Sequence, residues 1–158
     1  MQKITTFLMF DDRAGEAMNF YSSIFKNSAI LNTMPGSNGS VMGGTLEIEG
    51  QKLMTFNGGP SFSFSQGISL FVKAETQKEI DELYEKLSDG GEKKHCGWLT
   101  DKFGVSWQIV PPILGEMLRD TDRQKADSVL QAMLKMRKIN IDELERAYTG
   151  DNSNPQSE

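Results

Sequence analysis

The same order of predicted elements occurs twice along this chain, and this repeat limits the possible folds more than any single motif does. A strand, a helix and three further strands are predicted over residues 4–57, and the same order is predicted over residues 67–110. The two halves have negligible sequence identity, so what repeats is the order of elements. Two such units favour an α+β chain over a doubly wound parallel sheet, in which strands and helices alternate.

The spacing of apolar residues predicts one helix in each half. Residues 14–25 and 75–87 carry apolar side chains three and four positions apart, which gives each helix one apolar face. Asp11 and Asp12 are expected to cap the first helix and Thr76 the second. Short polar side chains do this because they accept hydrogen bonds from the free N–H groups at a helix start.

A hairpin is predicted over residues 96–111, where two strand-like segments flank the turn Asp101–Gly104. Asp bonds to its own backbone and Gly tolerates a positive φ, so both suit a tight turn. Trp98 and Trp107 lie on these strands, and each either fills the core or lines a ligand pocket. Neighbouring strand residues point to opposite faces, so Gln108 is expected to face a cleft, away from Trp107.

Composition and charge exclude several classes of function. The chain of 158 residues has 22 acidic and 17 basic residues, a net charge of −5, and nucleic-acid binding instead needs clustered cations. No apolar run is long enough to span a membrane, and the N-terminus shows no signal-peptide pattern. The single cysteine, Cys96, forms no internal disulfide, which favours a reducing cytoplasm. We therefore expect a cytoplasmic protein with neither a nucleic-acid nor a membrane partner.

The part of the chain after Pro111 and Pro112 differs in composition and is predicted to be helical. Helices are expected over residues 113–118, 122–136 and 141–147. The polar segment 149–158 is predicted to be a disordered tail, because it has too few apolar residues to form a core.

An ordered set of segments carries a resemblance to a known family. The segments are Phe7–Asp11, Ala17–Phe25, Phe56–Pro60, Ile68–Val72, Cys96–Pro111, Ala132–Ile139 and Leu144. Together they resemble the PhnB-like branch of the vicinal oxygen chelate (VOC) superfamily, which has the glyoxalase and bleomycin-resistance fold. The resemblance covers residues 3–148. It implies one domain over residues 1–148, made of paired βαβββ modules over about 3–60 and 66–112 with C-terminal helices over 113–148, and it implies a homodimer.

The metal-binding positions of this superfamily carry unusual residues in this chain. The resemblance places the following residues at the four strand positions: Thr6; Met54 or Thr55; Gly67 or Ser69; and Gln108. None of them is the His or Glu that holds a divalent metal in such enzymes, and imidazole and carboxylate are the ligands those metals prefer. We therefore expect no metal and no other cofactor.

The combination of fold and missing ligands predicts a protein that binds a small planar molecule without a metal. We expect the pocket to be lined by six side chains: Thr6, Phe56, Ser69, Phe71, Trp98 and Gln108. In the expected homodimer, residues 122–136 or the segment Phe62–Phe64 contact the second subunit.

Two enzymatic alternatives remain open at this point. One is a VOC enzyme of isomerase, lyase or dioxygenase type, in which Gln108, Ser69 or Thr6 supply hydrogen bonds at an atypical site. The other is the demethylubiquinone methyltransferase activity with which members of this branch are labelled. A nucleotide-like cofactor is usually held by a G-x-G pattern between a strand and a helix, whereas the glycines here occur as adjacent pairs.

Overall fold

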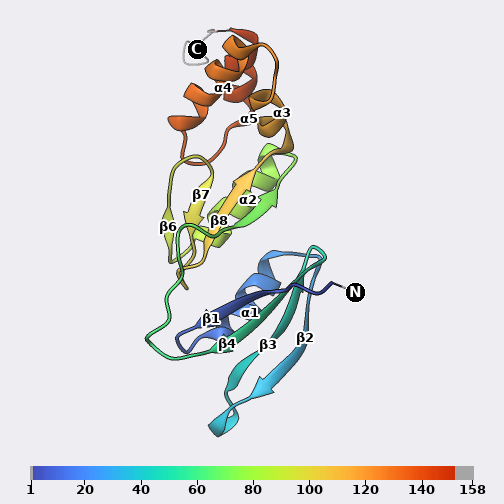
Figure 1. The fold of residues 1–158 in the computed structure, drawn as a ribbon, viewed down its shortest axis with the longest axis vertical. Coiled ribbons are helices and arrows are strands. Elements are labelled where there is room, and N and C mark those ends of the chain that lie inside the picture. The colour runs from blue at the N-terminus through green and yellow to red at the C-terminus, as the bar shows by residue number, and fades with distance from the viewer. Residues whose placement is uncertain (1, 152–158) are drawn as a thin grey trace. The chain divides into compact units, whose positions relative to one another are not determined.

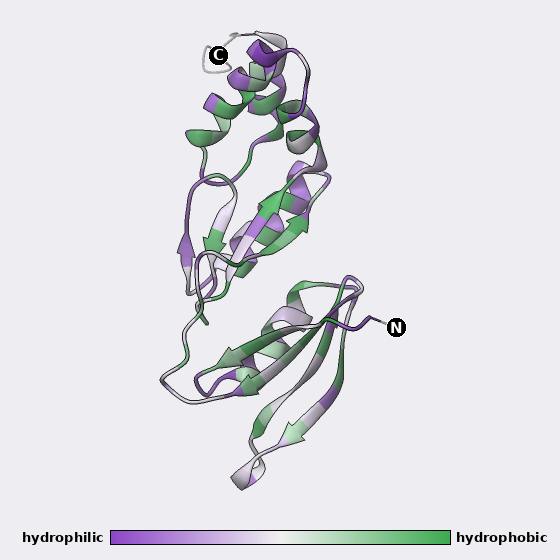
Figure 2. Cartoon of the chain, viewed as in Figure 1, coloured by the Kyte–Doolittle hydropathy of each residue, from purple (hydrophilic) through white to green (hydrophobic). Residues whose placement is uncertain are grey.

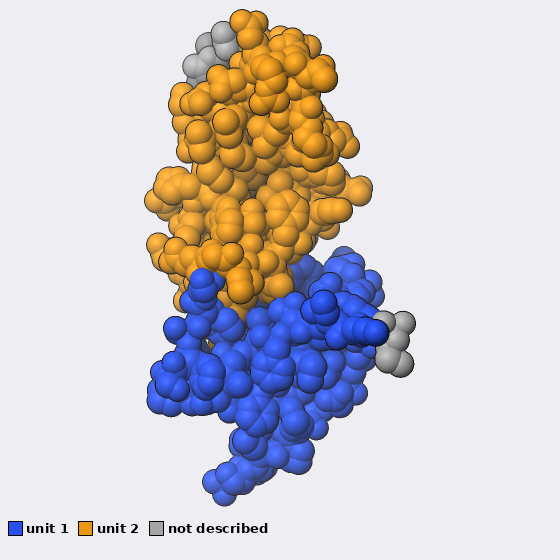
Figure 3. Space-filling view, viewed as in Figure 1, with its two compact units in different colours: residues 1–65 blue, residues 66–158 orange. Residues whose placement is uncertain are grey.

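The computed structural model describes residues 2–151 and divides the chain into two compact units, residues 1–65 and residues 66–158 (Figure 3). Figure 1 shows the elements of each unit. Unit 1 contains β1 (Thr6–Phe10), α1 (Ala14–Ile24), β2 (Ser28–Pro35), a short 3₁₀ helix (Ser37–Gly39), β3 (Val41–Ile48) and β4 (Gln51–Asn57). Unit 2 contains β5 (Leu70–Lys73), α2 (Gln77–Ser88), β6 (Glu92–Lys93), β7 (Trp98–Thr100), β8 (Ser106–Val110), α3 (Pro112–Leu118), α4 (Arg123–Leu134) and α5 (Ile141–Thr149).

The two units have the same sheet topology. Sheet A has the strand order β1-β4-β3-β2 and sheet B the order β5-β8-β7-β6. The first strand of each unit pairs in parallel with the last, β1 with β4 and β5 with β8, and the other pairs are antiparallel. This confirms the α+β fold of paired βαβββ modules. The expected tail lies outside the described residues from position 152 onward.

Helix α1 covers one face of sheet A. Its residues Ala17, Met18 and Tyr21 are buried, and so are the strand residues that alternate toward them, Leu8, Phe10, Leu46 and Leu53. Burial of such side chains contributes about 1.5–3 kcal/mol each, which fixes the helix on this face.

The expected capping of α1 by Asp11 or Asp12 is wrong. Arg13 occupies the N-cap position and makes no side-chain cap, and Asp11 Oδ1 accepts a hydrogen bond from the neighbouring Asp12 N–H at 2.7 Å. Asn57, the last residue of β4, caps the helix instead, because its Oδ1 accepts a hydrogen bond from the Ala14 N–H at 2.8 Å. The free donor at the helix start is thus satisfied across the sheet rather than by the preceding turn.

Helix α2 covers one face of sheet B in the same way. Thr76 caps it as expected, because its Oγ1 accepts a hydrogen bond from the Glu79 N–H at 3.2 Å. Its buried residues Ile80, Tyr84 and Leu87 face the buried strand residues Leu99, Trp107 and Ile109. The edge strand β6 is coloured hydrophilic in Figure 2, and charged residues at a sheet edge disfavour pairing with other chains.

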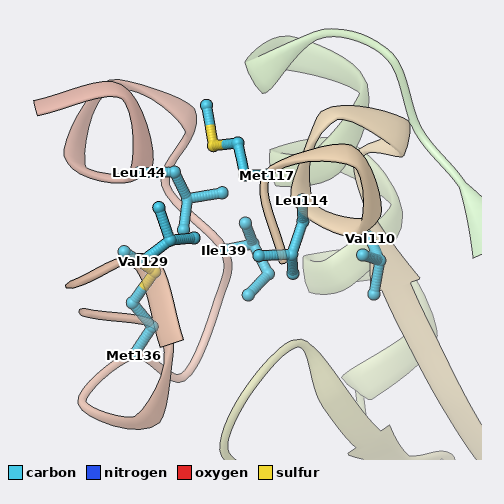
Figure 4. Packing of buried hydrophobic residues seen from close by; sticks show 7 residues of the cluster. All are labelled: Val110, Leu114, Met117, Val129, Met136, Ile139 and Leu144. Atoms are coloured by element: carbon cyan, nitrogen blue, oxygen red, sulfur yellow. The ribbon is translucent and has the colours of Figure 1, made fainter. Parts of the chain in front are cut away.

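The C-terminal helices α3, α4 and α5 form a second hydrophobic cluster within unit 2 (Figure 4). Its buried members are Val110, Leu114, Met117, Val129, Met136, Ile139 and Leu144. The segment between α4 and α5 is joined to the sheet by main-chain hydrogen bonds, from Cys96 N to Met136 O at 2.9 Å and from Gly97 N to Arg137 O at 2.7 Å. Gln77, at the start of α2, binds the same segment through Ile139 O at 3.0 Å and the Ile141 N–H at 2.8 Å.

Candidate functional site

The face of sheet B opposite α2 carries a row of side chains that converge on one amide. Gln108 on β8 lies opposite Phe71 on β5 and opposite Trp98 on β7. Its Nε2 donates a hydrogen bond to Ser69 Oγ at 2.9 Å. Residues that are opposite in register share a face of the sheet, so two aromatic rings flank this amide–hydroxyl pair.

The row next to Gln108 adds two hydroxyl groups. Thr100 on β7 lies opposite Ser106 on β8, on the same face as Trp98 and Gln108 by strand alternation. Thr100 Oγ1 is buried and has no hydrogen-bond partner within the part of the chain that the structure describes. A buried hydroxyl without a partner is costly unless water or a ligand satisfies it. We call this surface the Gln108 face; it consists of Ser69, Phe71, Trp98, Thr100, Ser106 and Gln108.

The Gln108 face offers both polar and aromatic contacts. Phe71 is 54% exposed, and Trp98 and Gln108 are half-buried. With its Nε2 on Ser69, Gln108 presents its carbonyl oxygen as an acceptor, and Ser69 keeps its O–H as a donor. A donor and an acceptor between two rings can orient a planar ligand, which is how small-molecule sites obtain specificity.

Tyr84 of α2 supports the main chain at the edge of this face from the opposite side of the sheet. Its Oη lies 2.9 Å from the Lys94 carbonyl oxygen and 3.1 Å from that of Trp98. Burial raises the pKa of the Tyr84 phenol, so the neutral form that donates a hydrogen bond is favoured. The main chain beside Trp98 is therefore held in place.

The structure distinguishes the two tryptophans as a core residue and a residue of the Gln108 face. Trp107 is a core residue, only 2% exposed, and its Nε1 donates to Asp101 Oδ2 at 2.9 Å. Asp101 is itself buried, and its Oδ1 accepts from the N–H groups of Phe103 at 2.9 Å and Val105 at 3.0 Å. The Asp101–Gly104 turn is therefore a structural motif, and Trp98 is the tryptophan on the Gln108 face.

Sheet A carries a different surface on the face opposite α1. Phe7 lies opposite Met54, and Met9 lies opposite Phe56. Phe7 is 48% exposed and Met54 is 40% exposed. We call these four residues the Phe7 face; it is apolar and carries two flexible methionines.

The structure brings together four of the six expected site residues. Ser69, Phe71, Trp98 and Gln108 lie on the Gln108 face, and Phe56 lies on the Phe7 face of the other unit. Thr6 lies opposite Leu53, which is 2% exposed, so alternation places Thr6 on the face that α1 covers. Sequence reasoning missed Thr100, because its significance comes from its buried hydroxyl and its register with Ser106.

The donor set on both faces does not match a metal site. Among the described residues, no group of three or more His, Cys, Asp or Glu side chains is placed to hold a metal ion. The polar groups next to Gln108 are hydroxyls and an amide, which bind metals weakly unless several carboxylates or imidazoles join them. The residues therefore do not fit the divalent metal of the superfamily's enzymes. Within the described part of the chain, no helix has the length and apolar character of a membrane span.

Comparison with known proteins identifies the family. Residues 2–110 match the family model described as 3-demethylubiquinone-9 3-methyltransferase. A solved structure from Bacillus cereus, described as a 3-demethylubiquinone-9 3-methyltransferase, PhnB protein, is 38% identical with a TM-score of 0.65, over 70% of this chain and 99% of that one. No curated protein sequence matches this chain.

A second similar structure supports the fold. The fosfomycin resistance protein FosX from Listeria monocytogenes, solved with Mn(II) and sulfate, is 19% identical with a TM-score of 0.57, over 75% of this chain and 100% of that one. The family model ends at Val110, the last residue of β8, so α3, α4 and α5 lie beyond it. The chain belongs to the PhnB-like branch of the VOC superfamily, the family that the 3-demethylubiquinone-9 3-methyltransferase model describes.

Proposed function

We propose that this protein binds a small planar molecule on the Gln108 face and that it does so without a metal. The observation that carries this proposal is the hydrogen bond of 2.9 Å between Gln108 and Ser69, set between Phe71 and Trp98. An amide that only stabilised the fold would need no exposed aromatic ring beside it, yet Phe71 is 54% exposed.

The aromatic residues supply the contact area and the polar pair supplies the orientation. Stacking on Trp98 or Phe71 contributes about 0.5–1.5 kcal/mol beyond the burial of apolar area. A ligand edge that pairs with Gln108 and Ser69 satisfies their remaining donor and acceptor, and a ligand that lacks this edge leaves them unpaired at a cost of about 1–3 kcal/mol.

Binding is favoured over methyl transfer by the positions of the glycines. Gly43 and Gly44 lie inside β3, Gly58 and Gly59 follow β4 in a loop that leads to β5, and Gly90 and Gly91 lie between α2 and β6. None of these pairs lies between a strand and the N-terminus of a helix, which is where a nucleotide-like cofactor is usually held.

We further propose that the protein is a cytoplasmic homodimer. Of the two phenylalanines expected at the contact, Phe62 is 49% exposed, whereas Phe64 packs edge-on against Phe10 with ring centroids 5.2 Å apart. Leu134, at the end of α4, is 51% exposed. Exposed large apolar residues of this kind favour burial against a second copy.

The test uses the two indole N–H signals in an ¹⁵N-correlated NMR spectrum. We expect 2-naphthamide, a neutral planar probe with an amide edge, to shift the Trp98 signal and leave the Trp107 signal in place, because Trp107 is buried against Asp101. Gln108→Leu should weaken this binding, and Gln51→Leu, which changes an exposed strand glutamine of the other sheet, should not. An unchanged Trp98 signal at saturating probe would contradict the proposal.

A further inference from the structure

Lys94 continues the row of side chains on the Gln108 face. Its N–H donates to the Trp98 carbonyl at 3.0 Å, which extends the pairing of β6 with β7 by one residue. Its neighbour Lys93 binds Glu85 of α2 at 2.7 and 2.8 Å, so Lys93 lies on the α2 side of the sheet. Strand alternation therefore places Lys94 on the opposite side, beside Trp98.

Four strands thus contribute one side chain each to a single row. In order across the sheet these are Lys94, Trp98, Gln108 and Phe71. Neighbouring strands lie about 4.8 Å apart, so the row is about 14 Å long. A planar ring over Gln108, between Trp98 and Phe71, leaves one end of the molecule within reach of the long Lys94 side chain.

The charge of this face differs in sign from that of the whole chain. Alternation also places Lys73, two residues after Phe71, and Glu92, two residues before Lys94, on this side. Two cations and one anion therefore face the row, in a chain whose net charge is −5. Lys94 is half-buried and, within the described residues, forms no ion pair with a carboxylate, whereas Lys93 does.

We infer that the ligand of the Gln108 face is an organic anion, a planar ring that carries a carboxylate, and that Lys94 binds the carboxylate. This inference rests on the proposed function and specifies its ligand class. The main chain of Lys94 is held by Trp98 on one side and by the Tyr84 hydroxyl on the other, so the ammonium group extends from a fixed point. Glu92 repels the carboxylate from the Thr100 end and directs it toward Trp98.

The experiment compares 2-naphthoate with 2-naphthamide, which share the ring and differ in charge. Affinities come from the shift of the Trp98 indole signal in the full-length protein, at low and at high salt. We expect the wild type to bind naphthoate about fivefold more tightly at low salt, the usual size of a partly exposed ion pair, with the preference shrinking as salt screens it. Lys94→Gln should remove the preference and leave the naphthamide affinity unchanged.

Lys93→Gln is the matched control, because the adjacent lysine carries the same charge on the other side of the sheet. It should keep the preference for naphthoate. Equal affinity of the wild type for both probes would overturn this inference and leave the proposed function standing. Binding of neither probe would overturn both. Loss of the preference in Lys73→Gln rather than in Lys94→Gln would place the anion at the β5 end and overturn the role of Lys94.

Discussion

Sheets A and B share one strand order and one relation to a covering helix, yet the faces opposite those helices have different chemistry. The Phe7 face of sheet A carries phenylalanine and methionine side chains. The Gln108 face of sheet B carries an amide, hydroxyls and two aromatic rings. Most of the residues that alternate toward α1 and α2 are apolar in both sheets, with Thr6, Thr55 and Lys93 as polar members. The buried apolar positions therefore fix the topology, and the alternate positions supply the ligand chemistry.

The corresponding hairpin turns of the two units differ in the same way. The turn between β3 and β4 uses Glu49 and Gly50, with φ values of 48° and 80°, and it is exposed. The turn between β7 and β8 is built on the buried carboxylate of Asp101. The second unit therefore depends on a single side chain for a turn that the first unit obtains from backbone conformation.

The largest predicted effect tests this difference between the turns. Asp101→Asn replaces one acceptor oxygen by a donor. This removes either the hydrogen bonds from the N–H groups of Phe103 and Val105 or the one from Trp107 Nε1. We expect a loss of about 2–3 kcal/mol in the stability of sheet B, measured as a lower urea midpoint by tryptophan fluorescence. Glu49→Gln, in the equivalent turn, should change stability by less than about 0.5 kcal/mol. Equal effects of the two changes would refute the contrast.

The second prediction separates a ligand-binding amide from a structural one. Gln108→Leu should weaken naphthamide binding about tenfold and lower the stability by less than about 1 kcal/mol. If the amide mainly supports Ser69, its removal instead deprives the Ser69 hydroxyl of this hydrogen bond and lowers the stability by about 1–3 kcal/mol. Thermal denaturation, measured together with the binding assay, decides between these results. Unchanged binding with a large drop in Tm would show that Gln108 has a structural role and does not bind the ligand.

The third prediction concerns the apolar surface of unit 1. Light scattering at micromolar concentration should give twice the mass of the 17.6 kDa chain. Phe62→Ser should weaken the dimer about tenfold, the size expected for a buried aromatic contact, whereas Phe64→Leu should have less effect because Phe64 packs within its own unit. A wild-type monomer would reject the homodimer.

The smallest predicted effect is a pH dependence of the C-terminal helices. Tyr148 Oη donates to Asp120, which lowers the pKa of Asp120 from its ordinary 3.8 and raises the pKa of Tyr148 from its ordinary 10.0. The stabilisation is lost as pH falls through the lowered pKa of Asp120, and again as pH rises through the raised pKa of Tyr148. Tyr148→Phe should remove the alkaline step from the helical circular-dichroism signal and reduce the acid step. The acid step persists in part because the Asp122 N–H still donates to Asp120 Oδ1 at 2.8 Å and still lowers its pKa. A double variant with Asp120→Asn should behave like Asp120→Asn alone.

The sequence predicted what depends on local pattern. The boundaries of β4 are Gln51–Asn57 as expected, the Thr76 cap is correct, and alternation placed Gln108 opposite in direction to Trp107. These features follow from residues a few positions apart, for which periodicity is informative.

The sequence could not predict what depends on pairing between distant segments. Asn57 caps a helix that begins 43 residues earlier in the chain, and no local motif marks it. Residues 4–10 show little polar alternation, so the face on which Thr6 lies became clear only from its pairing with Leu53. The burial of Asp101 was equally hidden, because an Asp in a turn is usually exposed.

The attachment of the C-terminal helices to sheet B has a consequence for how this molecule opens over time. The amide protons of Cys96 and Gly97 are bonded to the carbonyls of Met136 and Arg137, outside the sheet ladder itself. Their exchange with solvent therefore requires release of the segment between α4 and α5, and it does not require unfolding of β7 and β8. Exchange at these two adjacent amides therefore reports the local opening. Exchange at Leu99, inside β7, instead reports the unfolding of the sheet.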